Sequence, residues 1–372
     1  MKILFVTQVD LDAPHGGARH VQAVCGALAK AGHTVRLLAR GGGAIPGVGR
    51  PQVPKVPAGA RLEAVLAALI AKEAVFHRPD VAYVRISAST SATVAALSLA
   101  RIPVVLELNG PILEELSRRQ RSPQAIALAR ASLQAAVWQA RSVVAASENV
   151  GRHAREALAA TQVEVVLNGV DLEIALPEDR ASARRFFELP EGPRFLVLVG
   201  TLVQELRLDL LAEAHRKLPG VGLLIVGDGP QAAFVDAMSV AARPSSPVLF
   251  TGAVPHPVAI RAIAASDVAL NVRDGDLGMK GLEYAAVGRR QVAFEMPGSA
   301  RLEGLYPPEL EAVHLVKERS VPALRAAIVA ALAAEERQGP LPKPAIDAAR
   351  AQLGWEHKAQ ALIAILERAG RR

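Results

Sequence analysis

The chain has 372 residues, of which 51% are hydrophobic and 21% charged, and its formal net charge is +7. This length exceeds one ordinary hydrophobic core and predicts two domains of roughly 150 to 200 residues each. No uncharged apolar run reaches the roughly 18 residues that a membrane-spanning helix needs. The single cysteine, Cys25, excludes internal disulfides and a cysteine-based zinc site, and we expect a cytoplasmic protein.

The positive net charge favours an anionic partner. Aromatic residues make up 3% of the chain, so few rings are available to stack on bases, and we expect no nucleic-acid binding. Arginines cluster at 118–121, ahead of a helix pattern that carries Ile126, Leu128, Leu133 and Trp138. A solvated helix face is the favoured interpretation of this pattern, and a peripheral contact with an anionic inner membrane surface is the alternative.

Strand-like apolar runs alternate with stretches of helical periodicity along the chain. Such β-α-β repetition predicts parallel sheets that helices cover on both faces. The pattern restarts after the polar, proline-bearing stretch 171–194, which we expect to be a hinge between two tandem doubly wound domains. The expected strands are 2–7, 34–38, 81–84, 104–108, 143–146 and 163–167 in the first domain, and 195–200, 222–226, 248–251, 268–272 and 291–294 in the second.

The expected domain limits follow from this restart. The N-terminal domain spans residues 1–172 and the C-terminal domain spans residues 173–352. The tail, 353–372, has a helical pattern whose apolar face we expect to pack back on the N-terminal domain. That apolar face consists of Leu353, Trp355, Ala359, Leu362 and Leu366.

The segment 274–288 gives the clearest indication of a ligand site. Gly278, Lys280 and Glu283 stand at the start of an expected helix. The N–H groups of a helix's first turn have no internal partner and lie at the positive end of its dipole, so phosphate oxygens bind there. The carboxylate of Glu283 can accept both hydroxyls of a ribose, and Lys280 supplies a cation. The alternative interpretation of Glu283 is a carboxylate that only complements the helix dipole.

Two other glycine motifs follow strands. Gly16 and Gly17 begin a helix after the first strand, where a parallel sheet places ligands, although a turn that needs positive φ explains them equally well. The run 227–232, Gly-Asp-Gly-Pro-Gln-Ala, matches the dinucleotide pattern loosely. The strand after it ends without the acidic residue that holds a ribose, which disfavours a nicotinamide enzyme.

Several stretches together resemble the retaining glycosyltransferases of family 4, which have the two-domain GT-B fold. The resemblance covers nearly the whole chain and predicts an α/β structure with two tandem doubly wound, Rossmann-like domains and a deep cleft between them. The matching stretches are the first strand with Gly16-Gly17, the strand from Pro79 with Tyr83 and Arg85, Pro103 to Pro111, Val144 to Ser147, Asn168 to Asp171, Gly200 to Leu202, Asp209 to Leu211, Val226 to Pro230, Thr251 to Pro255, Lys280 to Gly288 and Trp355-Glu356.

The resemblance implies a nucleotide-diphosphate sugar donor bound mainly by the second domain and an unknown hydroxyl acceptor bound by the first. No metal and no cofactor besides the donor are implied. Arg85 and Glu107 are the residues expected on the acceptor side. The donor-binding residues that the resemblance implies are Gly16, Gly17, Gly200, Thr201, Gly252, Val254, Gly275, Gly278, Met279 and Glu283.

The chain departs from the family pattern at its charged positions. The first glutamate of the family's Glu-x7-Glu motif falls on Gly275, which Asp274 and Asp276 flank. The family's diphosphate-binding arginine and lysine fall on Thr201 and Leu206. In many members a histidine ends the strand at the position where this chain has Asn109.

Four side chains are therefore the expected catalytic set, with Lys280 and the N-terminus of its helix in the main role. They are Asn109, Lys280, Arg207 and Asp276. Two other classes of function stay open. One is a catalytically silent relative that binds a sugar nucleotide or acts as a partner subunit, and the other, less favoured, is a sugar-nucleotide 2-epimerase.

Overall fold

The computed structural model describes residues 1–12, 16–176, 178–275 and 277–371. The chain forms two compact units, and each is described by itself. The first unit comprises Met1–Gly169 and Trp355–Arg372, and the second comprises Val170–Gly354. These limits lie within three residues of the domain limits expected above.

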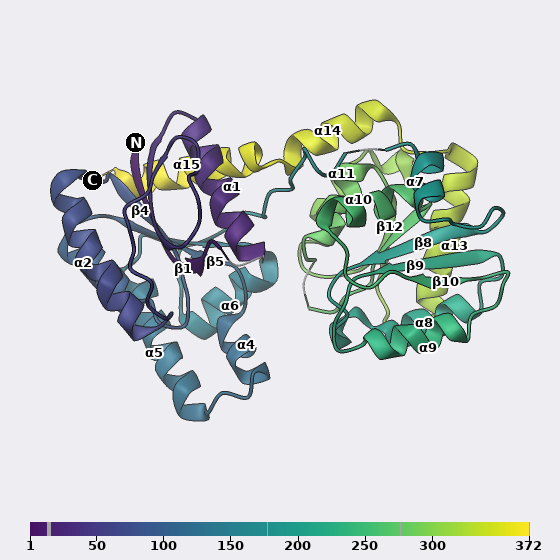
Figure 1. Cartoon of the computed structure of the whole chain (residues 1–372), viewed down its shortest axis with the longest axis horizontal. Helices are drawn as coiled ribbons and strands as arrows, with labels where there is room; N and C mark the ends of the chain where they lie inside the picture. The colour runs from purple at the N-terminus through teal and green to yellow at the C-terminus, as the bar shows by residue number, and fades with distance from the viewer. Residues whose placement is uncertain (13–15, 177, 276, 372) are drawn as a thin grey trace. The chain divides into compact units, whose positions relative to one another are not determined.

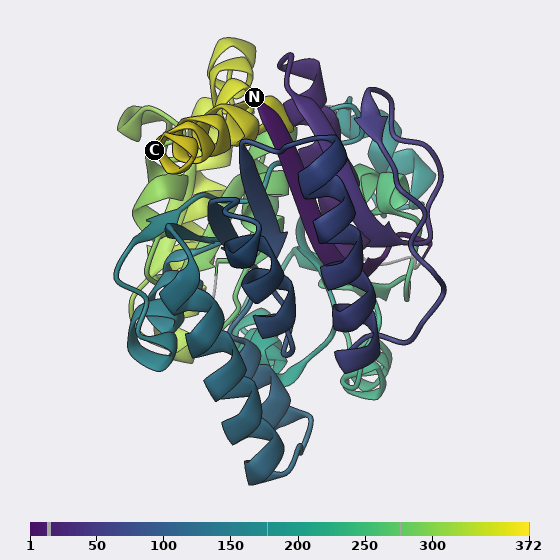
Figure 2. The same ribbon diagram turned by 90° about the vertical axis from the view of Figure 1, so that its left-hand side faces the viewer.

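A parallel sheet forms the centre of the first unit (Figures 1 and 2). Among the described residues it has seven strands in the order β3-β2-β1-β4-β5-β6-β7. The pairing places Arg85 of β4 beside Glu107 of β5. The strands are β1 (Lys2–Asp10), β2 (Thr34–Arg40), β3 (Val48–Gly49), β4 (Val81–Arg85), β5 (Val104–Leu108), β6 (Ser142–Ala145) and β7 (Val163–Val165).

Helices cover both faces of this sheet because alternate residues of each strand point to opposite sides. In β1, Ile3 and Phe5 pack with α1 (Gly16–Lys30) and α15 (Trp355–Gly370). Leu4 and Val6 pack with the opposite layer. The opposite layer contains α2 (Ala60–Phe76), α3 (Ser91–Leu99), α4 (Ile112–Arg118), α5 (Pro123–Gln139) and α6 (Glu148–Leu158).

The C-terminal helix α15 completes the first unit. Its buried residues recur at helical spacing and join the core formed by β1, β2 and α1. The expected packing of the tail on the N-terminal domain is therefore present. The residues that α15 buries in this core are Ala359, Leu362, Ile365, Leu366 and Ala369.

The second unit is also a parallel sheet between two helical layers (Figure 1). Its described residues form six strands in the order β10-β9-β8-β11-β12-β13. The strands are β8 (Arg194–Val199), β9 (Val221–Val226), β10 (Val248–Phe250), β11 (Val268–Asn271), β12 (Arg290–Phe294) and β13 (Val313–Val316). The helices are α7 (Arg180–Phe186), α8 (Leu208–Arg216), α9 (Ala232–Val240), α10 (His256–Ala265), α11 (Lys280–Val287), α12 (Ser299–Glu303), α13 (Val321–Gln338) and α14 (Lys343–Leu353), with short 3-10 turns at Gln204–Leu206 and Pro308–Leu310.

Two features of the second unit differ from the sequence-based expectations. Strand β13 and the helices α12 to α14 follow the last strand that was expected. Part of the presumed hinge instead forms α7, where Arg180 donates to Asp267 Oδ1 at 2.7 Å and to Glu335 Oε1 at 2.5 Å. These ion pairs fix α7 to the second unit. None of the described helices is both long and apolar enough to cross a membrane.

Candidate functional site

Glycine loops join the carboxyl ends of β8, β9 and β10. Gly200 N donates to Val226 O at 3.0 Å, and Gly227 N donates to Gly252 O at 2.9 Å. Gly227 has a φ of 141°, and a Cβ there would lie 1.8 Å from Gly200 O. The loop therefore requires glycine at positions 227 and 229, because only a residue without a Cβ lets the two backbones pack this closely. The loose match to a dinucleotide motif at 227–232 is explained by that packing.

A second group of glycines borders open space. No described atom lies within 4 Å of the position that a Cβ would take at Gly200, Gly252, Gly275 or Gly278. The last three have φ values of 67°, 94° and 64°, which favour glycine. All four follow strands β8, β10 or β11, so they line the carboxyl edge of the sheet, where open α/β sheets bind ligands.

Helix α11 begins at Lys280 beside these open glycines. The residue before it, Met279, gives its first turn no side-chain cap. The helix start is held against the sheet by Gly281, where a Cβ would lie 2.7 Å from Asn271 Nδ2. Gln291 Nε2 also donates to Gly281 O at 3.1 Å. The first turn of α11 is thus fixed from the sheet side and carries the positive end of the helix dipole.

Glu283 lies in the first turn of α11 and is 6% exposed. It accepts hydrogen bonds from Lys280 Nζ at 2.6 Å and from His256 Nε2 at 3.1 Å. Burial raises the pKa of Glu283, but the hydrogen bond from His256 and the charge of Lys280 outweigh burial and place that pKa below its usual value. Glu283 is therefore an ionised acceptor at the edge of the open space.

The cations near this edge are arranged differently from the expectation. Arg207 bonds Asp209 Oδ1 at 3.0 Å and reaches Asp274 Oδ2 at 3.5 Å. Arg319, which the sequence did not single out, contacts the other oxygen of Asp274 at 3.3 Å. Arg273 follows β11, and its Nε is buried without a hydrogen-bond partner among the described residues. Three arginines thus accompany Lys280 at this edge.

The other residues considered on the donor side differ in how exposed their side chains are. Thr201 is exposed and Val254 half-buried, so both side chains can reach a ligand. Leu206 is buried in the core, so the family's lysine position holds a packing residue here. Asp276 lies outside the described residues, and its predicted sugar contact stays a prediction.

In the first unit, Glu107 joins a buried network near the carboxyl end of β5. It is 1% exposed and accepts hydrogen bonds from His20 Nε2 and Tyr83 OH, both at 2.8 Å, and from Lys358 Nζ at 3.4 Å. Arg85 Nη1 lies 3.6 Å from it. Burial raises the pKa of Glu107, but these contacts hold it well below its usual value.

This network ties together α1, β4, β5 and α15, so the surroundings of Glu107 are those of a structural anchor. Its predicted contact with an acceptor stays a prediction, and Arg85, at the end of β4, is the more accessible member of the pair. Gly16 and Gly17 begin α1, one turn before His20, and among the described residues no atom lies within 4 Å of the position that a Cβ would take at Gly16. Asn109 is half-buried, and its Nδ2 has no hydrogen-bond partner among the described residues.

The apolar positions expected on one face of α5 are split between two environments. Leu133 is fully buried in the core, whereas Leu128 and Trp138 are 73% and 87% exposed. Arg118 pairs with Glu114 at 3.4 Å. The expected membrane-contacting face is therefore wrong for Leu133, because this residue packs against the sheet.

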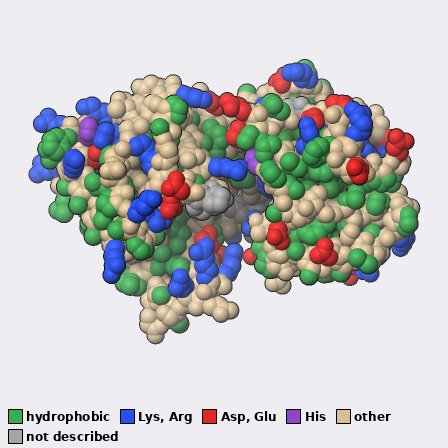
Figure 3. Space-filling model, viewed as in Figure 1, with side chains coloured by type: hydrophobic (Ala, Val, Ile, Leu, Met, Phe, Trp, Pro, Cys, Tyr) green, Lys and Arg blue, Asp and Glu red, His purple; other side chains and the backbone are tan. Residues whose placement is uncertain are grey.

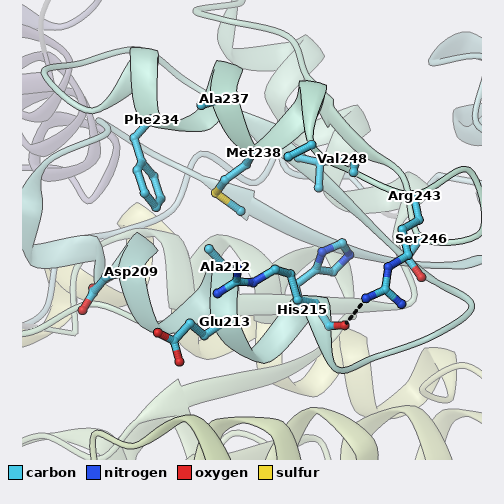
Figure 4. Close-up of a pocket in the computed structure, with 13 residues that line it drawn as sticks. Asp209, Ala212, Glu213, His215, Phe234, Ala237, Met238, Arg243, Ser246 and Val248 are labelled. Carbon is cyan, nitrogen blue, oxygen red and sulfur yellow. Dashed lines mark hydrogen bonds between the residues drawn. The ribbon is translucent and has the colours of Figure 1, made fainter.

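A separate pocket of about 510 Å³ lies between α8 and α9 (Figure 4). Phe234 and Met238 line it on one side, and His215 lies on the other. The pocket runs along α8 and α9, from Asp209 near the start of α8 to Ser246 and Val248 at the amino end of β10. None of the open glycines Gly200, Gly252, Gly275 and Gly278 is among the residues that line it.

Comparisons with known proteins agree with this geometry. The model of Glycosyltransferase Family 4 matches residues 14–174, and that of Glycosyl transferases group 1 matches residues 193–334. A D-inositol 3-phosphate glycosyltransferase of Mycobacteroides abscessus is 39% identical over 75 residues, which are 20% of this chain and 17% of that protein. The chain thus matches less than a fifth of that relative's length.

Two solved structures have the same fold at low sequence identity. HepE of Anabaena, in complex with UDP, has a TM-score of 0.71 and 19% identity, with 99% of this chain and 100% of that chain covered. Sucrose-phosphate synthase of Thermosynechococcus elongatus has a TM-score of 0.72 and 20% identity, with 99% of each chain covered. The fold is that of the two-domain, Rossmann-like GT-B glycosyltransferases.

The two family models together cover well over half of the chain, one in each unit. The protein belongs to the family 4 type of glycosyltransferases.

Proposed function

We propose that this protein transfers a glycosyl group from a nucleotide-diphosphate sugar to a hydroxyl group of an acceptor. The observation that carries the proposal is Glu283, a buried and ionised carboxylate in the first turn of α11, beside the open glycines Gly275 and Gly278. A carboxylate accepts two hydroxyl donors, which suits a ribose, and a helix N-terminus suits the attached diphosphate. The relative's name supports glycosyl transfer, and HepE's complexes with UDP and UDP-glucose support the same donor class.

Donor binding exchanges the partners of Glu283. The carboxylate oxygens of Glu283 stop accepting a hydrogen bond from Lys280 and accept hydrogen bonds from the ribose hydroxyls instead. The ammonium group of Lys280 then turns to the diphosphate. The negative charge that develops on the departing diphosphate is then stabilised by Lys280, by Arg207 and by the α11 N–H groups. The acceptor hydroxyl attacks the anomeric carbon while the carbon–oxygen bond to the diphosphate breaks, and the hydroxyl proton leaves with the diphosphate. Retention of configuration and independence from metal remain parts of the proposal.

The acceptor side of the proposal rests on the first unit. Arg85 and Asn109 end or follow adjacent strands, and each has a buried nitrogen without a hydrogen-bond partner among the described residues. Such donors suit the oxygen atoms of an acceptor.

A thermal-shift panel of uridine, guanosine and adenosine diphosphate sugars tests the donor site. A donor at 100 times its Kd is expected to stabilise the protein by about 2.7 kcal/mol. In Glu283→Gln, donor affinity should fall about a hundredfold, because charge-assisted hydrogen bonds to the ribose become neutral ones. Asp347→Asn is the matched control, since Asp347 also pairs with a lysine within its helix but lies on α14. Unaltered donor affinity in Glu283→Gln would refute the ribose assignment.

Lys280→Ala tests the role in catalysis. We expect kcat to fall by about 10²- to 10³-fold, with a smaller change in donor affinity, because Lys280 acts mainly on the charge of the departing diphosphate. Lys343→Ala, which removes an exposed lysine from an i,i+4 pair, should leave kcat unchanged. Equal turnover of Lys280→Ala and the wild type would remove Lys280 from the mechanism.

One observation favours the second candidate, a donor-binding relative without turnover. The buried Leu206 and the exposed Thr201 stand where the family has its diphosphate-binding cations. Slow hydrolysis of a bound donor in the absence of acceptor distinguishes the two candidates. Release of free sugar supports the transferase, whereas tight binding with no release, over a broad panel of acceptors, supports the silent relative.

A further inference from the structure

Three helices in one layer of the first unit end in the same way. Each presents a large exposed apolar side chain, followed two or three residues later by an arginine in the turn that leads to the next strand. The pairs are Phe76 and Arg78 after α2, Leu99 and Arg101 after α3, and Trp138 and Arg141 after α5. We name these six residues the amino-edge stripe.

The apolar members of the stripe are fully available to a partner. Phe76 is 71% exposed, Leu99 is 86% exposed and Trp138 is 87% exposed. Side chains of this kind are scattered singly on most surfaces, but here they recur in three consecutive helix-to-strand turns. In the space-filling view, hydrophobic side chains among Lys and Arg side chains lie along the left-hand edge of the first unit (Figure 3).

The three turns lie side by side at the amino edge of the sheet. Their strands, β4, β5 and β6, are neighbours in the sheet. Ala82 N donates to Pro103 O, and Arg141 N donates to Val104 O, both at 2.8 Å, so the beginnings of these strands are in register. The helices α2, α3 and α5 pack against each other in one layer (Figure 2). Since neighbouring helices lie about 10 Å apart, the stripe spans roughly 20 Å.

The charge along the stripe is positive. Arg78, Arg101 and Arg141 are exposed. The nearby carboxylate of Glu73 is buried and bound to Arg36, so it does not neutralise the stripe. Asp80, two residues after Arg78, accepts the N–H of Lys2 at 2.7 Å, and its single negative charge is outnumbered by the three arginines. A second copy of this chain would bring the same positive charge to the contact, whereas an anionic surface would meet both the cations and the apolar side chains.

We propose that the amino-edge stripe binds a membrane surface that contains anionic lipids. The arginines contact lipid phosphates, and the rings of Phe76 and Trp138 enter the headgroup region, where amphipathic aromatic side chains are stabilised. Within the first unit, the carboxyl edge of the same sheet, with Arg85 and Asn109, then faces away from the lipid and stays open to water. The inference goes beyond the glycosyl transfer proposed above and does not depend on it.

Trp138 itself reports the contact. The chain has two tryptophans, and Trp355 is half-buried against Gly169, so Trp138 is the fully exposed one. Adding vesicles of phosphatidylcholine with phosphatidylglycerol should shift the emission to the blue and make the protein co-sediment with the vesicles. Vesicles of phosphatidylcholine alone should give little of either effect, and high salt should reverse binding to the anionic vesicles. In Trp138→Phe the blue shift should disappear.

Two triple variants separate the contributions. Arg78→Gln/Arg101→Gln/Arg141→Gln should weaken binding to the anionic vesicles about a hundredfold. The second variant, Phe76→Ser/Leu99→Ser/Trp138→Ser, should weaken it at least tenfold. All six side chains are exposed, so the variants should keep the wild-type Tm and the wild-type donor-induced thermal shift. The matched control, Leu176→Ser/Val240→Ser/Val329→Ser, removes three exposed apolar side chains of the second unit and should bind like the wild type.

Three results would overturn the proposal. The first is that the wild-type protein does not co-sediment with the anionic vesicles. The second is that the stripe variants bind the vesicles as well as the control variant does. The third is that the stripe binds an acidic protein but does not bind vesicles.

Discussion

Two buried glutamates, one in each unit, lie near the carboxyl edges of their sheets but have different surroundings. Glu107 is held by groups from α1, β4 and α15. Glu283 is held by His256 and by Lys280, whose side chain is 30% exposed. Both have a pKa below the usual value in spite of burial. A buried carboxylate can take up a ligand only where its present partners can be exchanged, and this difference is why we propose an anchoring role for Glu107 and a binding role for Glu283.

The largest expected effect is on stability, at the anchor. Glu107→Gln should lower the free energy of unfolding by about 3 to 5 kcal/mol, because it leaves the buried ammonium of Lys358 without its counter-charge. Glu283→Gln should cost less, since Lys280 can turn to water. Chemical denaturation of both variants measures the difference. Adding Lys358→Met to Glu107→Gln should recover part of the loss. A larger loss at Glu283 than at Glu107 would invert the comparison.

Two glycines sharpen the contrast at the donor edge. Gly281→Ala should destabilise the protein by about 1 to 3 kcal/mol, because the added methyl group meets Asn271 at 2.7 Å and Leu302 at 3.1 Å. Gly278→Ala meets no described atom and carries only the strain of a positive φ, about 1 to 2 kcal/mol. Donor affinity should nevertheless fall in Gly278→Ala, since the methyl group occupies the open space. Thermal shifts with and without a nucleotide sugar separate the two effects.

The smallest effect concerns pH and the anchor. Burial lowers the pKa of His20 from its ordinary value of 6.5, and Glu107 only partly opposes this. The unfolded chain therefore takes up a proton below pH 6.5 that the folded chain does not, and stability falls as the pH drops through this range. One such histidine contributes a slope of at most about 1.4 kcal/mol per pH unit.

His20→Gln should make the loss of stability below pH 6.5 shallower, because glutamine can still donate to Glu107 but does not titrate. Denaturation curves at several pH values measure the slope, with the exposed His357→Gln as control. An unchanged slope in His20→Gln would place the titration elsewhere, and the other histidines whose pKa is lowered by burial are His33, His153, His215 and His314.

The sequence predicted the sheets well because their strands are short apolar runs between helical stretches. Strand β13 was missed because three of its four residues are only half-buried at the edge of the sheet and include His314. Helical periodicity likewise placed the apolar residues of α15. The same periodicity puts Lys358 on the apolar face of α15, and a lysine on a buried face requires a carboxylate partner. That signal was present in the sequence and would have pointed to the buried network.

The candidate site was predicted where the residues are close in sequence. Lys280 and Glu283 lie one helical turn apart, so a local pattern brings them together. His256 lies 27 residues before Glu283 and meets it only because α10 packs beside α11. Arg319 meets Asp274 from the end of another strand. Such tertiary contacts cannot be inferred from a single sequence. The sequence does show that His256 and Arg319 each follow a strand, which indicates that both lie at the carboxyl edge of the sheet.

The place of α15 in the first unit has a consequence for synthesis of the chain. Residues 170–354 form a unit without a break, so it can fold as soon as it has left the ribosome. We expect the first unit to fold later, because its core and the counter-charge of Glu107 include side chains from residues 355–370. The expected order of folding is then the reverse of the usual N-terminal-first order. Nascent chains that stop before α15 should expose the apolar faces of α1 and β1 to chaperones.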